Sequence, residues 1–337
     1  MKKLFLHSAL LIFASVDGQT PITDANFAQA IETCLSTHPV TGMCSDSEYG
    51  AMPDWDVSSV TDMSDAFVNQ TNFNADISSW DVSNVTDMRT MFFGTNFNQH
   101  IGNWDVSNVT YMQSMFWGSP FNQDIGNWDV SNVTAMGYMF FENEAFNQPI
   151  GDWNVGNVTE MNLMFYDALE FNQDIGNWDV SNVTNMVSMF LSAPSFNQDI
   201  GNWDVSNVTN MNQMFRFASS FNQDLTGWCV SNISSEPSLF SDGSPLTQSN
   251  KPIWGTCPSL GLDENNQLNI SIYPNPTKEY LNIDCSSLES ISIYNILGKE
   301  LIKETSNRIK VSSLSKGVYF IKVSDGINSS TKKFIKN

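Results

Sequence analysis

The apolar positions of this chain repeat with a fixed period over most of its length. Tryptophan recurs every 24 or 25 residues, as Trp55, Trp80, Trp104, Trp128, Trp153, Trp178, Trp203 and Trp228. Most copies follow, with substitutions, the pattern that residues 171–184 show in its fullest form, Phe-Asn-Gln-Asp-Ile-Gly-Asn-Trp-Asp-Val-Ser-Asn-Val-Thr, and then a Met-x-x-Met-Phe segment. A period of this length is typical of a solenoid, in which each copy forms one coil and buries its apolar side chains against its neighbours.

Two periodicities alternate within one copy. Trp104 and Val106 are two residues apart, as on one face of a strand, whereas Met112, Met115 and Phe116 follow the i, i+3, i+4 spacing of a helical turn. A threonine just ahead of that turn is a residue type that caps helix N-termini. The pattern therefore predicts an α/β solenoid in which every coil contributes one short strand and one short helix, with the Trp, Met and Phe columns in its core.

Both ends of such a stack need caps. Residues 20–53 are predicted to form a helical N-terminal cap, with an amphipathic helix ending near Leu35 and Thr23 or Asp24 as its N-cap. The repeats and an irregular C-terminal cap then span residues 54–258. A linker at 259–268 and a last domain at 269–337 follow.

The first residues predict export. Lys2 and Lys3 precede an apolar run and then small residues, which is typical of a secretory signal peptide over residues 1–19. The run is too short for a membrane anchor, and no later stretch predicts a transmembrane helix. Because cysteines of exported chains form disulfides, we expect two pairs, Cys34 with Cys44 and Cys229 with Cys257.

The net charge of −21 is concentrated in the repeats. Residues 20–262 hold 27 acidic and 3 basic residues, whereas residues 263–337 hold 8 and 10. Such an acidic chain excludes nucleic acid as a partner, because phosphate binding needs clustered Lys and Arg.

Aspartates form two ranks that run along the stack. One rank follows the tryptophans and includes Asp81, Asp105, Asp129, Asp179 and Asp204, and the other precedes Ile as Asp124, Asp174 and Asp199. Like charges on neighbouring coils repel each other. Two interpretations remain open: each carboxylate accepts backbone N–H bonds, or Ca²⁺ ions bridge the coils and these ranks bind cations or a partner. The asparagine ranks predict side-chain amide ladders that satisfy turn backbone.

Nothing in the sequence indicates catalysis. Outside the signal segment only His38 and His100 carry imidazole, and His100 replaces an aspartate of one rank. Nucleotide-binding, zinc and nucleophile motifs are absent. We therefore predict no enzyme and no resident cofactor, with Ca²⁺ as the one ion in question.

The repeat resembles a known family. The spacing Ile-x-x-Trp-x-Val-x-x-Val over about residues 54–227 is similar to the leucine-rich-repeat skeleton, and the whole unit resembles the BspA-type repeat of bacterial surface proteins. Leucine is nearly absent, which argues against standard horseshoe curvature. The resemblance implies a surface or secreted protein, since some members are adhesins that bind host matrix proteins.

In the last domain the sequence consists of short runs of alternating apolar and polar residues, separated by turn residues. Such runs predict short strands and a small all-β sandwich. Its ordered motifs resemble the type IX secretion sorting domain of Bacteroidetes; they include Tyr273, Pro274, Asn275, Pro276, Gly298, Gly317 and Tyr319. The resemblance implies recognition by the type IX machinery and passage across the outer membrane, usually with removal of the domain.

These observations favour an exported, adhesin-like interaction protein that binds an unknown protein or glycan partner along the repeats. The alternative is a structural surface-coat component, ordered by calcium, with no discrete ligand.

Overall fold

The computed structural model describes residues 19–258, 268, 270–285, 288–295, 299–326 and 329–337. The chain divides into two compact units, Met1–Pro258 and Ser259–Asn337. The predicted signal peptide, apart from residue 19, and the predicted linker, apart from residue 268, lie outside the described residues. No helix within the described ranges is long and apolar enough to cross a bilayer.

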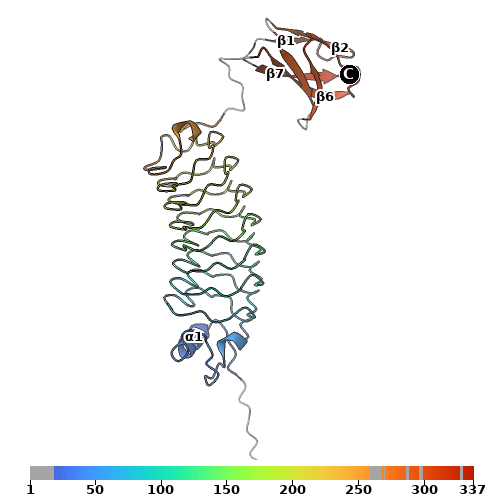
Figure 1. Ribbon diagram of the computed structural model, residues 1–337. Coiled ribbons are helices and arrows are strands. Elements are labelled where there is room, and N and C mark those ends of the chain that lie inside the picture. The colour runs from blue at the N-terminus through green and yellow to red at the C-terminus, as the bar shows by residue number, and fades with distance from the viewer. Residues whose placement is uncertain (1–18, 259–267, 269, 286–287, 296–298, 327–328) are drawn as a thin grey trace, which may run out of the picture. The chain divides into compact units, whose positions relative to one another are not determined.

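The first unit is a stack of coils with a cap at each end (Figure 1). Helix α1 (Phe27–Leu35) and the 3-10 turn η1 (Met52–Asp54) precede the coils, and the 3-10 turn η2 (Gln248–Asn250) follows them. Neighbouring coils meet in a line of single-residue parallel bridges through Asp62, Asp87, Tyr111, Ala135, Glu160, Asn185 and Asn210.

The prediction of an α/β solenoid is wrong, because the coils contain neither helices nor regular strands. Helix α1 is the one α-helix of the described residues, and all seven described strands lie in the second unit. The Met-x-x-Met-Phe segment forms overlapping β-turns, in which Met91 N donates to Met88 O and Phe93 N to Thr90 O. Thr90 has a φ of 54°, the left-handed value that the third residue of a type II turn requires.

The backbone prefers these turns because the stack offers a second partner for its amides. Every other N–H of the segment donates to the next coil, for example Met88 N to Tyr111 O at 3.0 Å and Thr90 N to Gln113 O at 2.9 Å. A run of i→i+3 turns places Met, Met and Phe on one face much as a helix does, so the apolar spacing alone does not distinguish the two. The threonine before the turns therefore caps no helix.

The predicted strand is also a pair of turns. Trp104 N donates to Ile101 O, and Val109 N donates to Val106 O, so the residues from Trp104 to Val106 are a short extended link between two turns. A link of this length shows the same two-residue alternation as a strand, but it makes no ladder.

The core is a set of aromatic and aliphatic columns, as predicted. The repeat tryptophans are 1–4% exposed, and the Met and Phe columns are almost completely buried. Two phenylalanines stack within each coil, as Phe92 on Phe97 at 3.9 Å, and each stacks on its equivalent in the next coil, as Phe92 on Phe116 at 5.6 Å. Each ring thus packs against a ring of its own coil and against rings of the neighbouring coils, which makes the coils mutually dependent.

Asparagines join the coils through two ladders, as the sequence predicts. In the first ladder, the asparagine of each Phe-Asn-Gln segment accepts a hydrogen bond from the backbone N–H of the equivalent residue in the next coil. Asn147 Oδ1, for example, accepts from Asn172 N at 3.0 Å. In the second, each donor asparagine, of the Ser-Asn-Val-Thr segment or its variants, donates Nδ2 to the preceding coil; Asn157, in Gly-Asn-Val-Thr, donates to Ser131 O at 2.7 Å. Trp153 Nε1 likewise donates to Ile125 O at 3.1 Å. These side-chain bonds satisfy backbone groups that have no ladder partner.

The N-terminal cap differs from its prediction in one respect. The N-cap of α1 is Asn26, not Thr23 or Asp24. Asp24 instead reaches the first coil, where its Oδ1 accepts the N–H of Thr61 at 2.7 Å and its Oδ2 accepts the Thr61 hydroxyl. In later coils the equivalent threonine N–H donates to the threonine carbonyl of the coil before, as Thr86 N does to Thr61 O. Asp24 therefore takes the place of a missing preceding coil.

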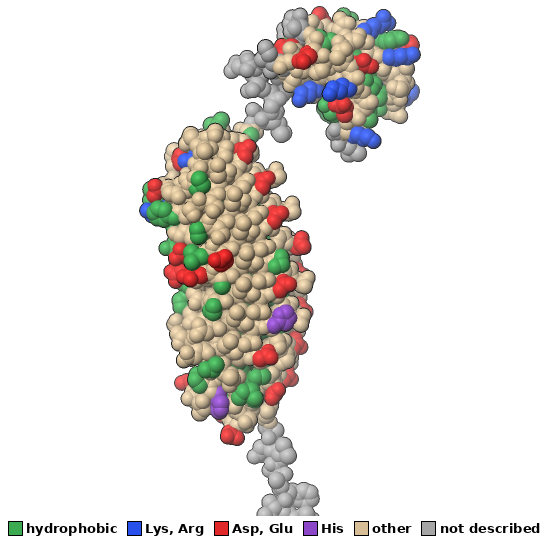
Figure 2. Space-filling model, viewed as in Figure 1, with side chains coloured by type: hydrophobic (Ala, Val, Ile, Leu, Met, Phe, Trp, Pro, Cys, Tyr) green, Lys and Arg blue, Asp and Glu red, His purple; other side chains and the backbone are tan. Residues whose placement is uncertain are grey.

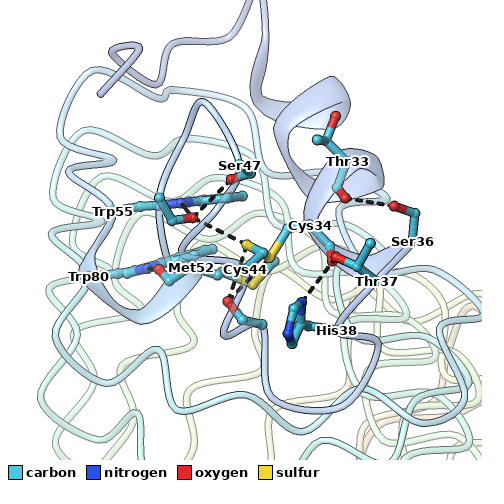
Figure 3. Close-up of a disulfide and its surroundings, with 12 residues drawn as sticks. Thr33, Cys34, Ser36, Thr37, His38, Cys44, Ser47, Met52, Trp55 and Trp80 are labelled. Carbon is cyan, nitrogen blue, oxygen red and sulfur yellow. Dashed lines mark hydrogen bonds between the residues drawn. A yellow bond between two sulfur atoms is a disulfide. The ribbon is translucent and has the colours of Figure 1, made fainter. Parts of the chain in front are cut away.

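Both predicted disulfides are confirmed. Cys34, on α1, pairs with Cys44 beside the first tryptophans (Figure 3), and Cys229 pairs with Cys257 in the C-terminal cap. Trp55 and Trp80 stack at 6.1 Å between ring centroids next to the first pair. Each disulfide thus closes one end of the stack.

The second unit is all-β, and its two sheets share one core. Sheet one has the order β1-β2-β5 and sheet two the order β4-β3-β6-β7, with all pairings antiparallel. The strands are β1 (Ser271–Tyr273), β2 (Tyr280–Asp284), β3 (Ser290–Tyr294), β4 (Glu300–Glu304), β5 (Arg308–Lys310), β6 (Gly317–Ser324) and β7 (Ser329–Lys336). Leu281, Ile293, Ile321 and Phe334 are fully buried between them.

Candidate functional site

The predicted aspartate ranks form turns. In the first rank, Asp81, Asp105, Asp129, Asp179 and Asp204 each accept the N–H of the serine two residues later, at 3.0–3.1 Å. In the second, Asp124, Asp174 and Asp199 accept the N–H of the glycine two residues later, at 2.9–3.0 Å. Aspartate favours this local turn because its side chain reaches its own backbone.

Hydrogen bonding stabilises the charged form of several of these carboxylates. The Ser83 hydroxyl and then its N–H lower the pKa of Asp81, and Ser181 lowers the pKa of Asp179 in the same way. All the ranked aspartates are exposed, so water also solvates them. The geometry therefore supports the backbone-bonded interpretation of the ranks.

The ranks make no metal site in the part of the chain that the structure describes. No group of three His, Cys, Asp or Glu side chains converges there. Each carboxylate belongs to the turn of its own coil, and the described geometry gives no independent support for calcium bridging.

Sequence reasoning missed a different surface, which we call the turn edge. It consists of the side chains that the Met-x-x-Met-Phe turns direct outward, and its central column is Val68, Phe93, Trp117, Phe141, Tyr166, Leu191 and Arg216. These positions differ from copy to copy, whereas the core and asparagine columns hardly change. That variation within the chain was the signal that could have found it.

Aromatic rings at the turn edge touch across four coils. Phe93 contacts Trp117 at 5.0 Å, and Trp117 contacts Tyr138 at 5.3 Å and Phe141 at 4.3 Å. Phe141 stacks on Tyr166 at 4.3 Å. Apart from Phe141, which is 9% exposed, these rings are half-buried, so they present partly exposed apolar surface outside the core.

Polar groups flank the aromatic strip. A hollow of about 250 Å³ lies beside it, lined by Ser64, Asp65, Arg89, Thr90, Gln113 and Ser114. Gln113 Oε1 is buried there without a hydrogen-bond partner among the described residues. Arg89 forms an ion pair with Asp87 and lies 5.3 Å from the Tyr111 ring centroid. One view of the stack shows acidic side chains beside apolar ones on its surface (Figure 2). The turn edge thus combines ring surface with hydrogen-bonding groups, which is the composition of recognition surfaces.

The sorting motifs of the second unit tie its first and last strands together. Asn275 Oδ1 accepts Ile335 N at 2.9 Å, and Asn275 Nδ2 donates to Lys333 O at 3.2 Å. Tyr273 ends β1, and Tyr319 lies on β6 with its hydroxyl donating to Ser315 O. The proline peptides on either side of Asn275 are cis. Gly317 begins β6, and Gly298 lies outside the described residues.

The fold and these surfaces define a repeat protein of stacked 24- or 25-residue coils with a separate all-β C-terminal module. The model of the family described as "Mycoplasma protein of unknown function, DUF285" matches residues 38–120, 95–193 and 171–256, so the chain belongs to this family of repeat proteins. Residues 271–337 match the family described as "Secretion system C-terminal sorting domain". No curated protein matches the chain.

The two families support an exported protein. A type IX sorting domain implies interaction with that secretion system and points to a protein that is secreted or held at the cell surface. Neither family is an enzyme family. The narrower assignment to BspA-type leucine-rich repeats stays a prediction.

Proposed function

We propose that this chain is a non-enzymatic interaction protein, exported by the type IX system, that binds a protein or glycan partner through its turn edge. The observation that carries the proposal is the run of touching aromatic side chains on the outside of the stack, from Phe93 to Tyr166. The repeat does not need these side chains, because the core is already filled by its own columns.

The chemistry of the turn edge suits recognition. Partly exposed Trp and Tyr rings supply large, rigid contact surface and are the residues that most often dominate binding energy. The hydroxyl, carboxylate and guanidinium groups of the adjacent hollow supply directional bonds. Gln113 Oε1 is an acceptor that is buried without a partner among the described residues. A ligand that donates a hydrogen bond to it therefore makes the free energy of binding more favourable.

The test compares the binding of two purified variants with that of the unchanged chain. Binding is measured on protein and glycan arrays and in pull-downs from cell-surface extracts. One variant replaces Trp117, Tyr138 and Tyr166 with Ala. The matched control replaces Val68 and Leu191 with Ala, since they occupy the central column outside the aromatic run. We expect binding to fall at least about tenfold in the first variant only.

Equal binding by all three proteins would refute the turn edge as the binding surface. The structural-coat hypothesis makes a different prediction, namely no retained partner with any of the three proteins and loss of an ordered surface layer in a deletion strain.

A further inference from the structure

The line of parallel bridges stops one coil before the repeats end. In each preceding coil the N–H of the first methionine donates to the next coil, as Met186 N does to Asn210 O at 2.9 Å. Each threonine carbonyl likewise accepts the next threonine N–H, as Thr184 O does from Thr209 N. Met211 N and Thr209 O are the next groups in line, and neither has a backbone partner among the described residues.

The sequence explains why the line stops. Four residues separate Val208 from Gln213, the next residue with left-handed φ, whereas five separate Ile233 from the equivalent Leu239. Those five residues, Ser-Ser-Glu-Pro-Ser, include no methionine to fill the core column. Glu236, which lies in this segment, forms an ion pair with Lys251 at the surface, with 2.6 Å between Lys251 Nζ and Glu236 Oε1. This segment, residues 234–238, therefore follows a different course from its equivalents in the earlier coils.

The displaced segment leaves a hollow of about 400 Å³ at the place where another coil would pair. Its lining includes Thr209, Met211 and Asn212 on one side and Asn232, Ser235 and Glu236 on the other. The backbone ladder resumes just beyond it, where Gln213 N donates to Ser238 O at 2.9 Å. The hollow is thus bounded at both ends, and an unpaired backbone donor and acceptor, two residues apart, border it.

We propose that this hollow, the ladder gap, binds an extended peptide segment of a partner by adding it to the ladder. One peptide N–H donates to Thr209 O, and the carbonyl of the next peptide residue accepts Met211 N, in the register that Thr209 and Asn210 adopt on the coil before. The peptide is neutral or basic at this point, because residues 20–262 hold 27 acidic and 3 basic residues. The ladder gap is a site apart from the turn edge and does not depend on it.

The probe is the capped peptide acetyl-Thr-Asn-Met-amide, which copies residues 209–211 and fits between Asn232, which already donates to Ser206 O, and Ser238, which already pairs with Gln213. Binding is followed on the full exported chain, with its disulfides intact, by the NMR signals of ¹⁵N-labelled methionine amides. The amide of Met211 should shift and become protected from solvent exchange, whereas that of Met186, already bonded, should not.

Two controls separate ladder pairing from other contacts. The same peptide methylated on its threonine nitrogen lacks the donor for Thr209 O and is expected to bind roughly tenfold more weakly or not at all. A closure variant, in which Thr-Asn-Met-Asn replaces residues 234–238, restores the regular coil and should abolish binding while its unfolding midpoint stays equal or rises.

An unshifted Met211 amide at millimolar peptide would overturn the proposal. So would equal binding of the methylated peptide or equal binding by the closure variant. Loss of turn-edge binding in the Trp117 variant has no bearing on these outcomes, so the two proposals fail separately.

Discussion

The two asparagine ladders use opposite ends of the side-chain amide, so one kind of substitution should affect them differently. Asn147 acts as an acceptor, since its Oδ1 receives Asn172 N at 3.0 Å and Gln173 Nε2 at 2.9 Å. Asn157 acts as a donor, since its Nδ2 gives a bond of 2.7 Å to Ser131 O. Replacing either with Asp keeps the size of the side chain and exchanges its NH₂ group for a carboxylate oxygen.

The expected magnitudes follow from these bonds. N147D keeps both acceptor bonds and makes them charge-assisted, so the free energy of unfolding should change by no more than about 0.5 kcal/mol. N157D loses its bond and places a carboxylate oxygen against the carbonyl of Ser131. Because Asn157 is exposed and water screens the repulsion, we expect a loss of about 1–2 kcal/mol. For a unit of this size the midpoint falls by roughly 2–8 °C.

The assay is thermal and urea unfolding of the two variants and the unchanged chain at pH 7 and near pH 3.5. The carbonyl disfavours the charged form of the introduced carboxyl, so its pKa is raised in the folded state. Protonation at low pH supplies an O–H that can donate to Ser131 O, and the deficit of N157D should then shrink. If N147D destabilised as much as N157D, or if low pH widened the deficit, the assignment of donor and acceptor ladders would be wrong.

Three further predictions concern the ends, the ranks and the glycines. Burial opposes ionisation of Asp24, but its bonds from Thr61 and the next N–H outweigh burial and lower the pKa of Asp24 below its ordinary 3.8. D24A should therefore cost about 1–2 kcal/mol at neutral pH, and its difference from the unchanged chain should disappear as the pH falls well below 3.8, as paired pH-dependent melts would show. Millimolar Ca²⁺ should leave the unfolding midpoint of the repeats unchanged, because the carboxylates already serve turns; a raised midpoint in calorimetry would contradict this. G126A should destabilise by about 1–3 kcal/mol, since its Cβ would lie 2.4 Å from Pro149 O, and V68A is a matched surface control expected to stay within about 0.5 kcal/mol.

Periodicity predicted what the core contains but not how the backbone runs. The buried columns and both disulfides follow from composition and position. The helix and strand did not follow, because an isolated i, i+3, i+4 pattern fits a run of turns as well as a helix. One local signal pointed to turns: the second left-handed position of the segment is Asn69, Gly94, Gly118 or Asp167 in four copies, and these residue types tolerate positive φ.

The sequence analysis did not find the turn edge, for a similar reason. Regular aspartate ranks drew attention because they repeat, yet repetition here reflects the turn that each Asp closes. Phe93 and Trp117 differ from their equivalents in other copies and therefore fell outside the repeat pattern. Their contact is visible only once the coils are stacked.

How the coils are joined explains which surface is free to carry function. On the asparagine and tryptophan side, side chains such as Asn147, Asn157 and Trp153 make the bonds between coils, so a change that removes such a bond weakens the stack. On the turn edge the backbone makes most of those bonds, as between Phe92 N and Met115 O at 2.9 Å, and outward rings such as Phe93 and Phe141 take no part in them. Residues at the turn edge therefore vary between copies at little cost in stability, and recognition can differ from coil to coil without altering the fold.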